Sequence, residues 1–166
     1  MSKTSIATVR ARPVPDVTSA AGPFRVEAET ISVDTTQRIE VIDLTDRIMD
    51  MVRRQAIREG LLSLSSLHTT STVFINEFQQ ALRTDMCAFL EQAVAADGQW
   101  LHNDPAHSDC DRMNAAAHLR AMLLGHSLTV PIGHGEIVLG QWQRLLMAEL
   151  DGPRTRSLRV TMLGIE

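Results

Sequence analysis

The fold class is decided by residues 127–163, which read SLTVPIGHGEIVLGQWQRLLMAELDGPRTRSLRVTML. Short runs of alternating apolar and polar residues lie here between glycines and a Gly-Pro pair, a pattern typical of strands that bury one face. The predicted strands are Ser127–Ile132, Glu136–Leu139, Trp142–Leu150 and Arg156–Leu163. Their connections are too short for the crossovers that parallel strands need. This part of the chain therefore predicts a mainly antiparallel sheet.

The alternation continues on the N-terminal side of this stretch. Residues Phe24–Thr30 alternate, a turn is expected near Asp34, and the chain resumes at Arg38–Val41. This pattern predicts a β-hairpin with one face in water. Two further strands are expected at Leu61–Leu67 and Ser71–Ile75.

Three segments carry the spacing of amphipathic helices. In the first, Asp43 is a good cap, apolar residues follow at 3.6-residue spacing, and Gly60 is placed to end the helix. The second presents Leu82–Val94 before a break at Asp97-Gly98, and the third runs from Met113 to Leu124 before Gly125. The sequence therefore predicts an α+β fold with three helices and mainly antiparallel, sandwich-like sheets.

Length and composition indicate one domain. The chain has 166 residues, of which 44% are hydrophobic, enough for one sizeable core. Residues 1–22 contain several prolines and no sustained periodicity, so we predict a flexible N-terminal arm there and a single domain over residues 23–166.

Charge and hydropathy exclude some classes of partner. The net charge is −4 and the pI is near 5.8, with no cluster of basic and aromatic residues, so no nucleic-acid partner is expected. No apolar run approaches the roughly 20 residues that span a bilayer, and the N-terminus lacks the apolar region of a signal peptide. We therefore expect no membrane partner and a cytoplasmic location. The two cysteines, Cys87 and Cys110, predict neither a disulfide framework nor a metal knuckle.

The distribution of histidines and carboxamides points to a functional site. His68 opens the motif His68-Thr69-Thr70, His102 opens His102-Asn103-Asp104, and Asn114 and His118 share one helix face. Three neutral imidazoles from separate elements can bind zinc and leave a position open for water or substrate. The alternative for each histidine is a core side chain with one satisfied hydrogen bond. We take a small metal or anion site as the leading hypothesis.

Three other polar or aromatic positions allow two interpretations each. Asn76-Glu77 can cap the following helix, or Glu77 can serve as a base at a pocket mouth. Asp151-Gly152-Pro153-Arg154 can be a plain turn, or Arg154 can clamp a phosphate. Trp142 can anchor the core or form a stacking wall. His107, His126 and His134 are expected on the surface, with His134 in a hairpin turn.

These motifs together resemble the YjbQ family, also called UPF0047. The resemblance rests on motifs that follow one another in order from about Phe24 to Glu166: His68-Thr69-Thr70, Val73-Phe74-Ile75-Asn76-Glu77, His102-Asn103-Asp104, Asn114-Ala115-Ala116-Ala117-His118-Leu119, Leu139-Gly140-Gln141-Trp142-Gln143 and Glu149-Leu150-Asp151-Gly152-Pro153-Arg154. It implies an α+β fold with a sandwich-like pair of sheets, a homotrimer, and a pocket near subunit boundaries that holds a metal ion and an anion.

The resemblance also implies roles for individual residues. His68, His102 and His118 correspond to metal ligands, and Glu77 and Asn114 to catalytic positions, with Glu77 a general base. Arg154 corresponds to an anion clamp, and Thr69, Thr70 and Trp142 join it as substrate- or anion-binding residues. The segment Pro105–Cys110 departs from the family pattern as a local insertion, and so does Ser71, which stands where a small apolar residue is common. The insertion is expected to bring His107 or Asp109 to the pocket rim.

Several activities fit these expectations. The family is commonly labelled a secondary thiamine-phosphate synthase, a transferase. Nitrogen ligands, however, suit zinc or a similar divalent transition metal better than the Mg²⁺ of pyrophosphate chemistry. Metal-assisted hydrolysis of a phosphorylated small molecule fits the same residues. A trimer that binds metal and ligand without turnover is the third hypothesis.

Overall fold

The fold combines eight strands, three α-helices and one short 3₁₀-helix in the part of the chain that the structure, a computed structural model, describes, namely residues 4–13 and 18–166. In chain order the elements are β1 (Phe24–Asp34), β2 (Glu40–Asp43), α1 (Thr45–Arg53), β3 (Glu59–Ser66), β4 (Ser71–Asn76), α2 (Gln80–Ala93), the 3₁₀-helix η1 (Leu101–Asn103), α3 (Ala115–Leu124), β5 (Ser127–Gly133), β6 (Glu136–Ile137), β7 (Arg144–Glu149) and β8 (Thr155–Ile165).

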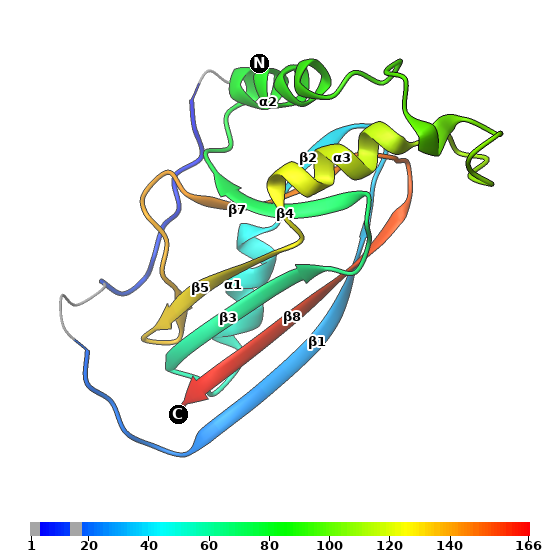
Figure 1. The fold of residues 1–166 in the computed structure, drawn as a ribbon. Coiled ribbons are helices and arrows are strands. Elements are labelled where there is room, and N and C mark those ends of the chain that lie inside the picture. The colour runs from blue at the N-terminus through cyan, green and yellow to red at the C-terminus, as the bar shows by residue number, and fades with distance from the viewer. Residues whose placement is uncertain (1–3, 14–17) are drawn as a thin grey trace.

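The strands form two antiparallel sheets. The larger sheet has the order β1-β8-β3-β5-β6 and the smaller one has the order β2-β7-β4. Every strand pair in both sheets is antiparallel. Figure 1 shows β1, β8, β3 and β5 side by side, with α1 behind them and α2 and α3 beside the smaller sheet. The predicted α+β fold with three helices and antiparallel sheets is confirmed.

Two apolar clusters hold these layers together. The main core lies between the five-stranded sheet, α1 and one face of the smaller sheet, and it includes Ile48, Leu62, Leu145 and Val160, all with 0% exposure. The second cluster packs α2 and α3 on the other face of the smaller sheet, where Ala121 meets Ala148 and Leu150. The smaller sheet is therefore covered on both faces, which explains why β7 is buried at every position.

The predicted hairpin between Phe24–Thr30 and Arg38–Val41 is wrong. β1 pairs with β8 along eleven residue pairs, whereas β2 pairs with β7 in the other sheet. The four residues of β2 offer a much shorter ladder than β8 does, so the long strand takes the long partner. Residues 35–39 carry the chain from one sheet to the other.

The predicted end of the first helix is also wrong, although its start is confirmed. The Asp43 carboxylate accepts a hydrogen bond from the Thr45 N–H at 2.9 Å, but α1 ends at Arg53 and Gly60 lies inside β3. A Cβ at Gly60 would lie 2.2 Å from the Leu163 carbonyl oxygen. Glycine is therefore needed here for the close approach of two strands rather than for ending a helix.

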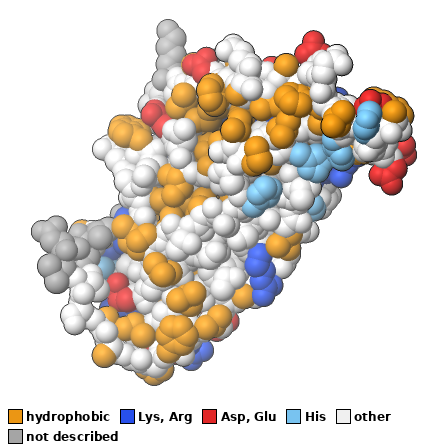
Figure 2. Space-filling model, viewed as in Figure 1, with side chains coloured by type: hydrophobic (Ala, Val, Ile, Leu, Met, Phe, Trp, Pro, Cys, Tyr) orange, Lys and Arg blue, Asp and Glu red, His pale blue; other side chains and the backbone are white. Residues whose placement is uncertain are grey.

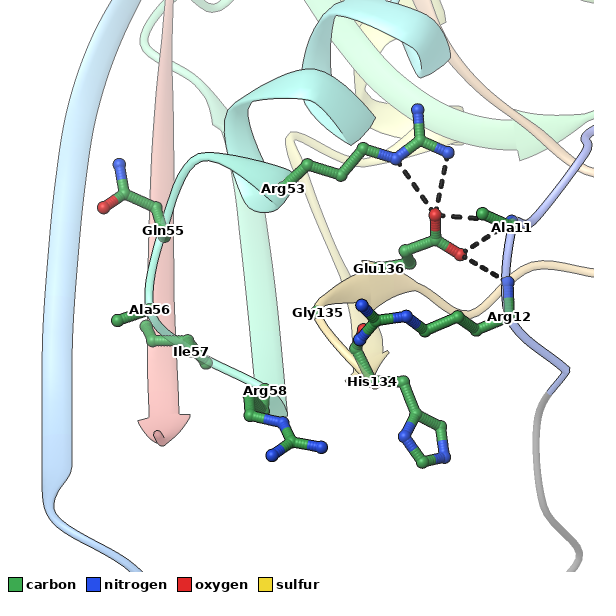
Figure 3. A pocket seen from close by; sticks show the side chains of 10 residues that line it. All are labelled: Ala11, Arg12, Arg53, Gln55, Ala56, Ile57, Arg58, His134, Gly135 and Glu136. Atoms are coloured by element: carbon green, nitrogen blue, oxygen red, sulfur yellow. Dashed lines mark hydrogen bonds and ion pairs between the residues drawn. The ribbon is translucent and has the colours of Figure 1, made fainter.

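Part of the predicted N-terminal arm lies against the domain. The Thr8 N–H donates to the Gln141 carbonyl at 2.8 Å, and the N–H groups of Ala11 and Arg12 donate to the Glu136 carboxylate (Figure 3). Residues 1–3 and 14–17 of this arm lie outside the described residues. Among the described helices, none is both long and apolar enough to cross a lipid bilayer.

Candidate metal and anion site

Two of the three predicted metal ligands meet. The rings of His102, on η1, and His118, on α3, have their centroids 5.0 Å apart and stand at 88° to each other. The Asn103 side chain accepts a hydrogen bond from the Ala115 N–H at 2.9 Å, so it fixes η1 to the start of α3. In Figure 2, histidine side chains form a band on one face of the molecule, bordered by hydrophobic side chains.

The histidine pair lines an apolar cavity of about 340 Å³. The remaining lining residues are Trp100, Leu101, Ala115 and Leu119. Burial and the nearby His102 ring lower the pKa of His118 below 6.5, and the opposing charge of Asp151 does not reverse this shift. At neutral pH His118 is therefore uncharged, which is the form that binds metal ions.

A buried carboxylate lies next to this pair and collects three polar side chains. Asp151 is 2% exposed, and its Oδ2 accepts hydrogen bonds from Arg112 Nε at 2.8 Å and from Asn114 Nδ2 at 2.9 Å. Arg154 Nη2 lies 3.4 Å from the same oxygen. Burial alone would raise the pKa of Asp151, but the hydrogen bonds from Arg112 and Asn114 outweigh it and lower the pKa below 3.8. Asp151 is therefore ionised and shared between two arginines.

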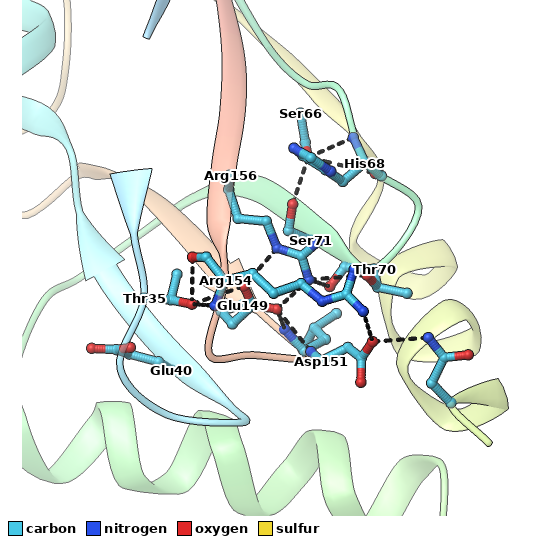
Figure 4. Close-up of polar contacts among 12 residues, drawn as sticks. Thr35, Glu40, Ser66, His68, Thr70, Ser71, Glu149, Asp151, Arg154 and Arg156 are labelled. Carbon is cyan, nitrogen blue, oxygen red and sulfur yellow. Dashed lines mark hydrogen bonds and ion pairs between the residues drawn. The ribbon is translucent and has the colours of Figure 1, made fainter. Parts of the chain in front are cut away.

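A second buried carboxylate lies two residues before Asp151 in the chain. Glu149 is fully buried, and its Oε2 accepts from Arg156 Nε at 2.6 Å (Figure 4). Arg156 Nη2 also donates to the Thr70 hydroxyl at 3.0 Å. The hydroxyl of Thr70 is thus engaged within the protein, whereas Thr69 is exposed.

His68 approaches this network from the end of β3. Its Nε2 accepts a hydrogen bond from the Ser157 N–H at 2.8 Å. Burial, followed by the positive charges of Arg156 and Arg154, lowers the pKa of His68 below 6.5 despite the opposing charge of Glu149. His68 is therefore neutral at pH 7 with its proton on Nδ1, so binding a metal ion through Nε2 would require breaking the contact with Ser157.

The described residues of a single chain do not complete a metal site. Among them, no three His, Cys, Asp or Glu side chains stand close enough to hold one ion. Of the three predicted ligands, His102 and His118 lie together, whereas His68 belongs to the adjoining carboxylate network.

Glu77 and Trp142 lie at the other end of the smaller sheet. In the β4–β7 ladder Ser71 pairs with Glu149, whereas Asn76 pairs with Arg144. Glu77 follows Asn76 and accepts a hydrogen bond from the Ser5 hydroxyl. Trp142 is 46% exposed in the turn before β7. Six strand residues span about 20 Å, so one chain keeps both residues away from the histidines.

The capping interpretation of Asn76-Glu77 is wrong. The cap of α2 is Gln79, whose side chain accepts a hydrogen bond from the Leu82 N–H at 2.9 Å. The Asn76 side chain instead accepts from the N–H of Glu77 at 2.8 Å. By contrast, His134 has a φ of +54° between β5 and β6, which confirms the predicted turn.

The predicted insertion Pro105–Cys110 is held by polar residues on either side of it. His107 Nδ1 lies 2.9 Å from Asp104 Oδ2, and the Cys110 thiol donates to Asn114 Oδ1 at 3.4 Å. Cys110 therefore joins the residues around Asp151, a position that its lone occurrence in the sequence did not indicate.

Arg112, Glu149 and Arg156 are the other residues that sequence reasoning missed. A signal for Arg156 exists in the alternation of β8, where it falls on the same buried face as Leu158, Val160 and Met162. A charge in phase with the apolar face of a strand requires a buried partner. Arg112 carries no comparable signal, because it lies in an irregular segment.

The family model and the sequence relatives indicate the same family. The family described as UPF0047 protein YjbQ-like matches residues 29–165. A UPF0047 protein of Methanothermobacter thermautotrophicus is 40% identical over 141 residues, which cover 85% of this chain and 94% of that protein. UPF0047 protein YugU of Bacillus subtilis is 31% identical over 82% of this chain and 98% of its own length.

Solved structures agree with the sequence matches. A YbjQ-like protein of unknown function from Sulfolobus solfataricus superposes with a TM-score of 0.80 at 31% identity, covering 86% of this chain and 99% of that one. A hypothetical protein from Aeropyrum pernix gives a TM-score of 0.76 at 33% identity, covering 83% and 98%. The chain therefore belongs to the YjbQ-like family of UPF0047 proteins.

Proposed function

We propose that this protein binds a divalent transition-metal ion, best matched by zinc, at His102 and His118, and holds a phosphate-bearing small molecule beside it. The observation that carries the proposal is the contact of these two rings, with centroids 5.0 Å apart, at an apolar cavity next to Asp151.

The donor set fits such an ion. A tetrahedral zinc ion with nitrogen bonds of about 2.0–2.1 Å brings two imidazole rings to a separation of this order. The lowered pKa of His118 favours the neutral, metal-binding form. The third ligand would be His68, whose unprotonated Nε2 would have to leave the Ser157 N–H to bind the ion. Because one chain does not group three such ligands among its described residues, a second copy in a homotrimer would supply it. The ion would act as a Lewis acid toward a bound oxygen.

Two arginines provide the anion-binding part of the site. Arg112 and Arg154 share the single carboxylate of Asp151, and their side chains are 49% and 36% exposed. Two guanidinium groups against one carboxylate leave a positive charge facing solvent, and a planar guanidinium matches a phosphate group well. Thr69, which precedes Thr70 in the chain, is exposed and would add a hydroxyl, while the apolar cavity would accept the non-polar part of the ligand.

Two enzyme activities use this arrangement, namely transferase chemistry of the thiamine-phosphate synthase type and hydrolysis of a phosphate ester. In either, Glu77 would act as the base with Trp142 as a ring-stacking wall, and Asn114 would orient Asp151 through its 2.9 Å hydrogen bond. Since Glu77 lies at the far end of β4, it would have to come from a neighbouring copy. The separation of Glu77 from the histidines within one chain favours a second candidate function, that of a trimer that binds metal and ligand without turnover.

The metal proposal is tested by elemental analysis of protein prepared without chelator or affinity-tag nickel. Wild type is expected to carry a transition metal, and His102→Ala and His118→Ala to lose most of it while keeping the circular dichroism spectrum. The matched control is His126→Ala, since His126 is exposed and lies outside the cavity. Metal retained by His118→Ala, or lost equally in the control, overturns the proposal.

The enzyme proposal is tested with the metal-loaded protein on a panel of phosphorylated metabolites and in a thiamine auxotroph. Glu77→Gln is expected to abolish turnover and keep the metal. If Glu77 comes from another copy, mixed oligomers of Glu77→Gln and His118→Ala chains regain turnover, because some of their sites are intact. Absence of turnover in every assay would leave the non-catalytic trimer as the function.

A further inference from the structure

A second cavity, of about 700 Å³, shares no lining residue with the cavity at the histidine pair. It is bounded by the turn between β5 and β6, the segment after α1 and the N-terminal segment. Figure 3 shows Arg12, Arg58 and His134 on one side of it and Arg53 and Glu136 on the other. None of these residues has a part in the site proposed above.

Glu136 organises this cavity and is fully used within the protein. Its side chain is 5% exposed, and Oε1 accepts from Arg53 Nη2 at 2.8 Å and from Arg53 Nε at 3.0 Å. The other oxygen accepts from the N–H groups of Ala11 and Arg12. Burial alone would raise the pKa of Glu136, but the hydrogen bonds from Arg53 and Arg12 outweigh it and lower the pKa below 4.5. The carboxylate therefore fixes the N-terminal segment and has no capacity left to neutralise further cations.

The cationic groups of the cavity outnumber its carboxylates. Arg12, Arg53 and Arg58 line it together with Glu136, and Arg10 and Glu59 lie next to these groups. Arg10 is occupied by backbone carbonyls, including that of Gly133 at 2.7 Å.

Three lining side chains remain available to a ligand, those of Arg12, Arg58 and His134. The guanidinium of Arg12 donates to the His134 carbonyl at 3.1 Å, and that of Arg58 makes no ion pair or hydrogen bond with the described residues. The His134 ring lies 3.8 Å from Glu59, beyond hydrogen-bond distance. Two guanidinium groups without a carboxylate partner thus face one cavity together with an imidazole.

We propose that this cavity is a second anion site, which binds a phosphorylated small molecule through Arg12, Arg58 and His134. Guanidinium groups that lack a carboxylate partner bind phosphate oxygens bidentately, and charge-assisted hydrogen bonds of this kind are about twice as strong as neutral ones. The volume exceeds that of one phosphate group, so the site suits a pyrophosphate or a phosphorylated metabolite. Arg12 precedes residue 29, where the match to the family begins, so the site depends on a segment outside the matched region.

Equilibrium dialysis of radiolabelled pyrophosphate against the full chain tests this inference. The experiment is done in an Arg112→Gln/Arg154→Gln background, which removes both arginines of the other proposed anion site. We expect saturable binding, weakened about tenfold or more by Arg12→Gln and by Arg58→Gln, as loss of a charge-assisted bidentate contact implies. His134 ring signals in NMR spectra should shift on addition of pyrophosphate.

The matched control is Arg54→Gln. Arg54 is exposed at the end of α1, next to Arg53, but does not line the cavity, so its substitution should change the dissociation constant less than twofold. Arg58→Lys, which keeps the charge and loses the fork, should bind between wild type and Arg58→Gln. Absence of saturable binding in the Arg112→Gln/Arg154→Gln background, or equal weakening by Arg54→Gln and Arg58→Gln, overturns the proposal.

Discussion

Arg156 and Glu149 form an ion pair that is shut off from solvent, with 1% and 0% of their side chains exposed and Nε 2.6 Å from Oε2. The pair connects β8 to the end of β7, and through the Thr70 hydroxyl it also fixes the start of β4. The three strands next to the loops that contain His68, Asp151 and Arg154 are therefore joined at one buried point.

Removing one partner of this pair should be costly. Arg156→Met leaves Glu149 buried without its counter-charge, so we expect the free energy of unfolding to fall by about 3–5 kcal/mol. Urea denaturation measures it. Arg159→Met, on the exposed face of the same strand, should change it by less than about 0.5 kcal/mol. The double variant Arg156→Met with Glu149→Leu should recover much of the loss, and a double variant no more stable than Arg156→Met would contradict this account.

The depressed pKa of Asp151 predicts an acid-dependent contribution to stability. Because its folded-state pKa lies below 3.8, the ionised carboxylate stabilises the folded state above that pH, and this contribution is lost as the pH falls through the folded-state value. Asp151→Asn should therefore be less stable than wild type at pH 7, and the difference should shrink below about pH 4. Denaturation series at several pH values measure both. A difference that stays constant down to pH 3 would argue against the ionised Asp151.

His68 should be neutral and protonated on Nδ1, since its Nε2 accepts from the Ser157 N–H. Its lowered pKa means that, as pH falls below 6.5, the unfolded chain takes up a proton that the folded chain resists. Folded wild type should thus lose stability below pH 6.5, and His68→Gln, which keeps an acceptor, should lose less. Nitrogen-15 NMR of the ring identifies the tautomer, and a proton found on Nε2 would exclude the Ser157 contact.

Strand pairing shows what local pattern can and cannot predict. The short connections after Ser127 require antiparallel neighbours, and that inference is confirmed for β5–β6. The partner of β1 depends on which strand of the whole fold offers the longest ladder. The residues near β1 do not contain that information, and the predicted hairpin with Arg38–Val41 is therefore wrong.

In the candidate site too, some placements follow from the sequence alone and others depend on the whole fold. Asn114 and His118 are one helical turn apart, so their placement on one face follows from the sequence alone. The contact between His102 and His118 depends instead on Asn103 capping α3 across an irregular segment. The separation of Glu77 from the histidines follows from the length and direction of β4, since a strand carries its two ends apart. The assembly of Glu77 and the histidines into one site of a homotrimer stays a prediction.

The facing glycines of β3 and β8 provide a last prediction. Gly60 pairs with Gly164, and a Cβ on Gly164 would lie 2.2 Å from the Glu59 carbonyl oxygen and 2.7 Å from the Gly60 Cα. Both obstacles are backbone atoms that cannot rotate away, so Gly164→Ala must separate the two central strands or bend one of them. We expect a loss of about 1–3 kcal/mol in the free energy of unfolding. Arg159→Ala on the same strand, whose side chain is exposed, should cost less than about 0.5 kcal/mol. Hydrogen exchange should accelerate along the β3–β8 ladder in Gly164→Ala only, and equal stability of the two variants would show that the strands do not approach this closely.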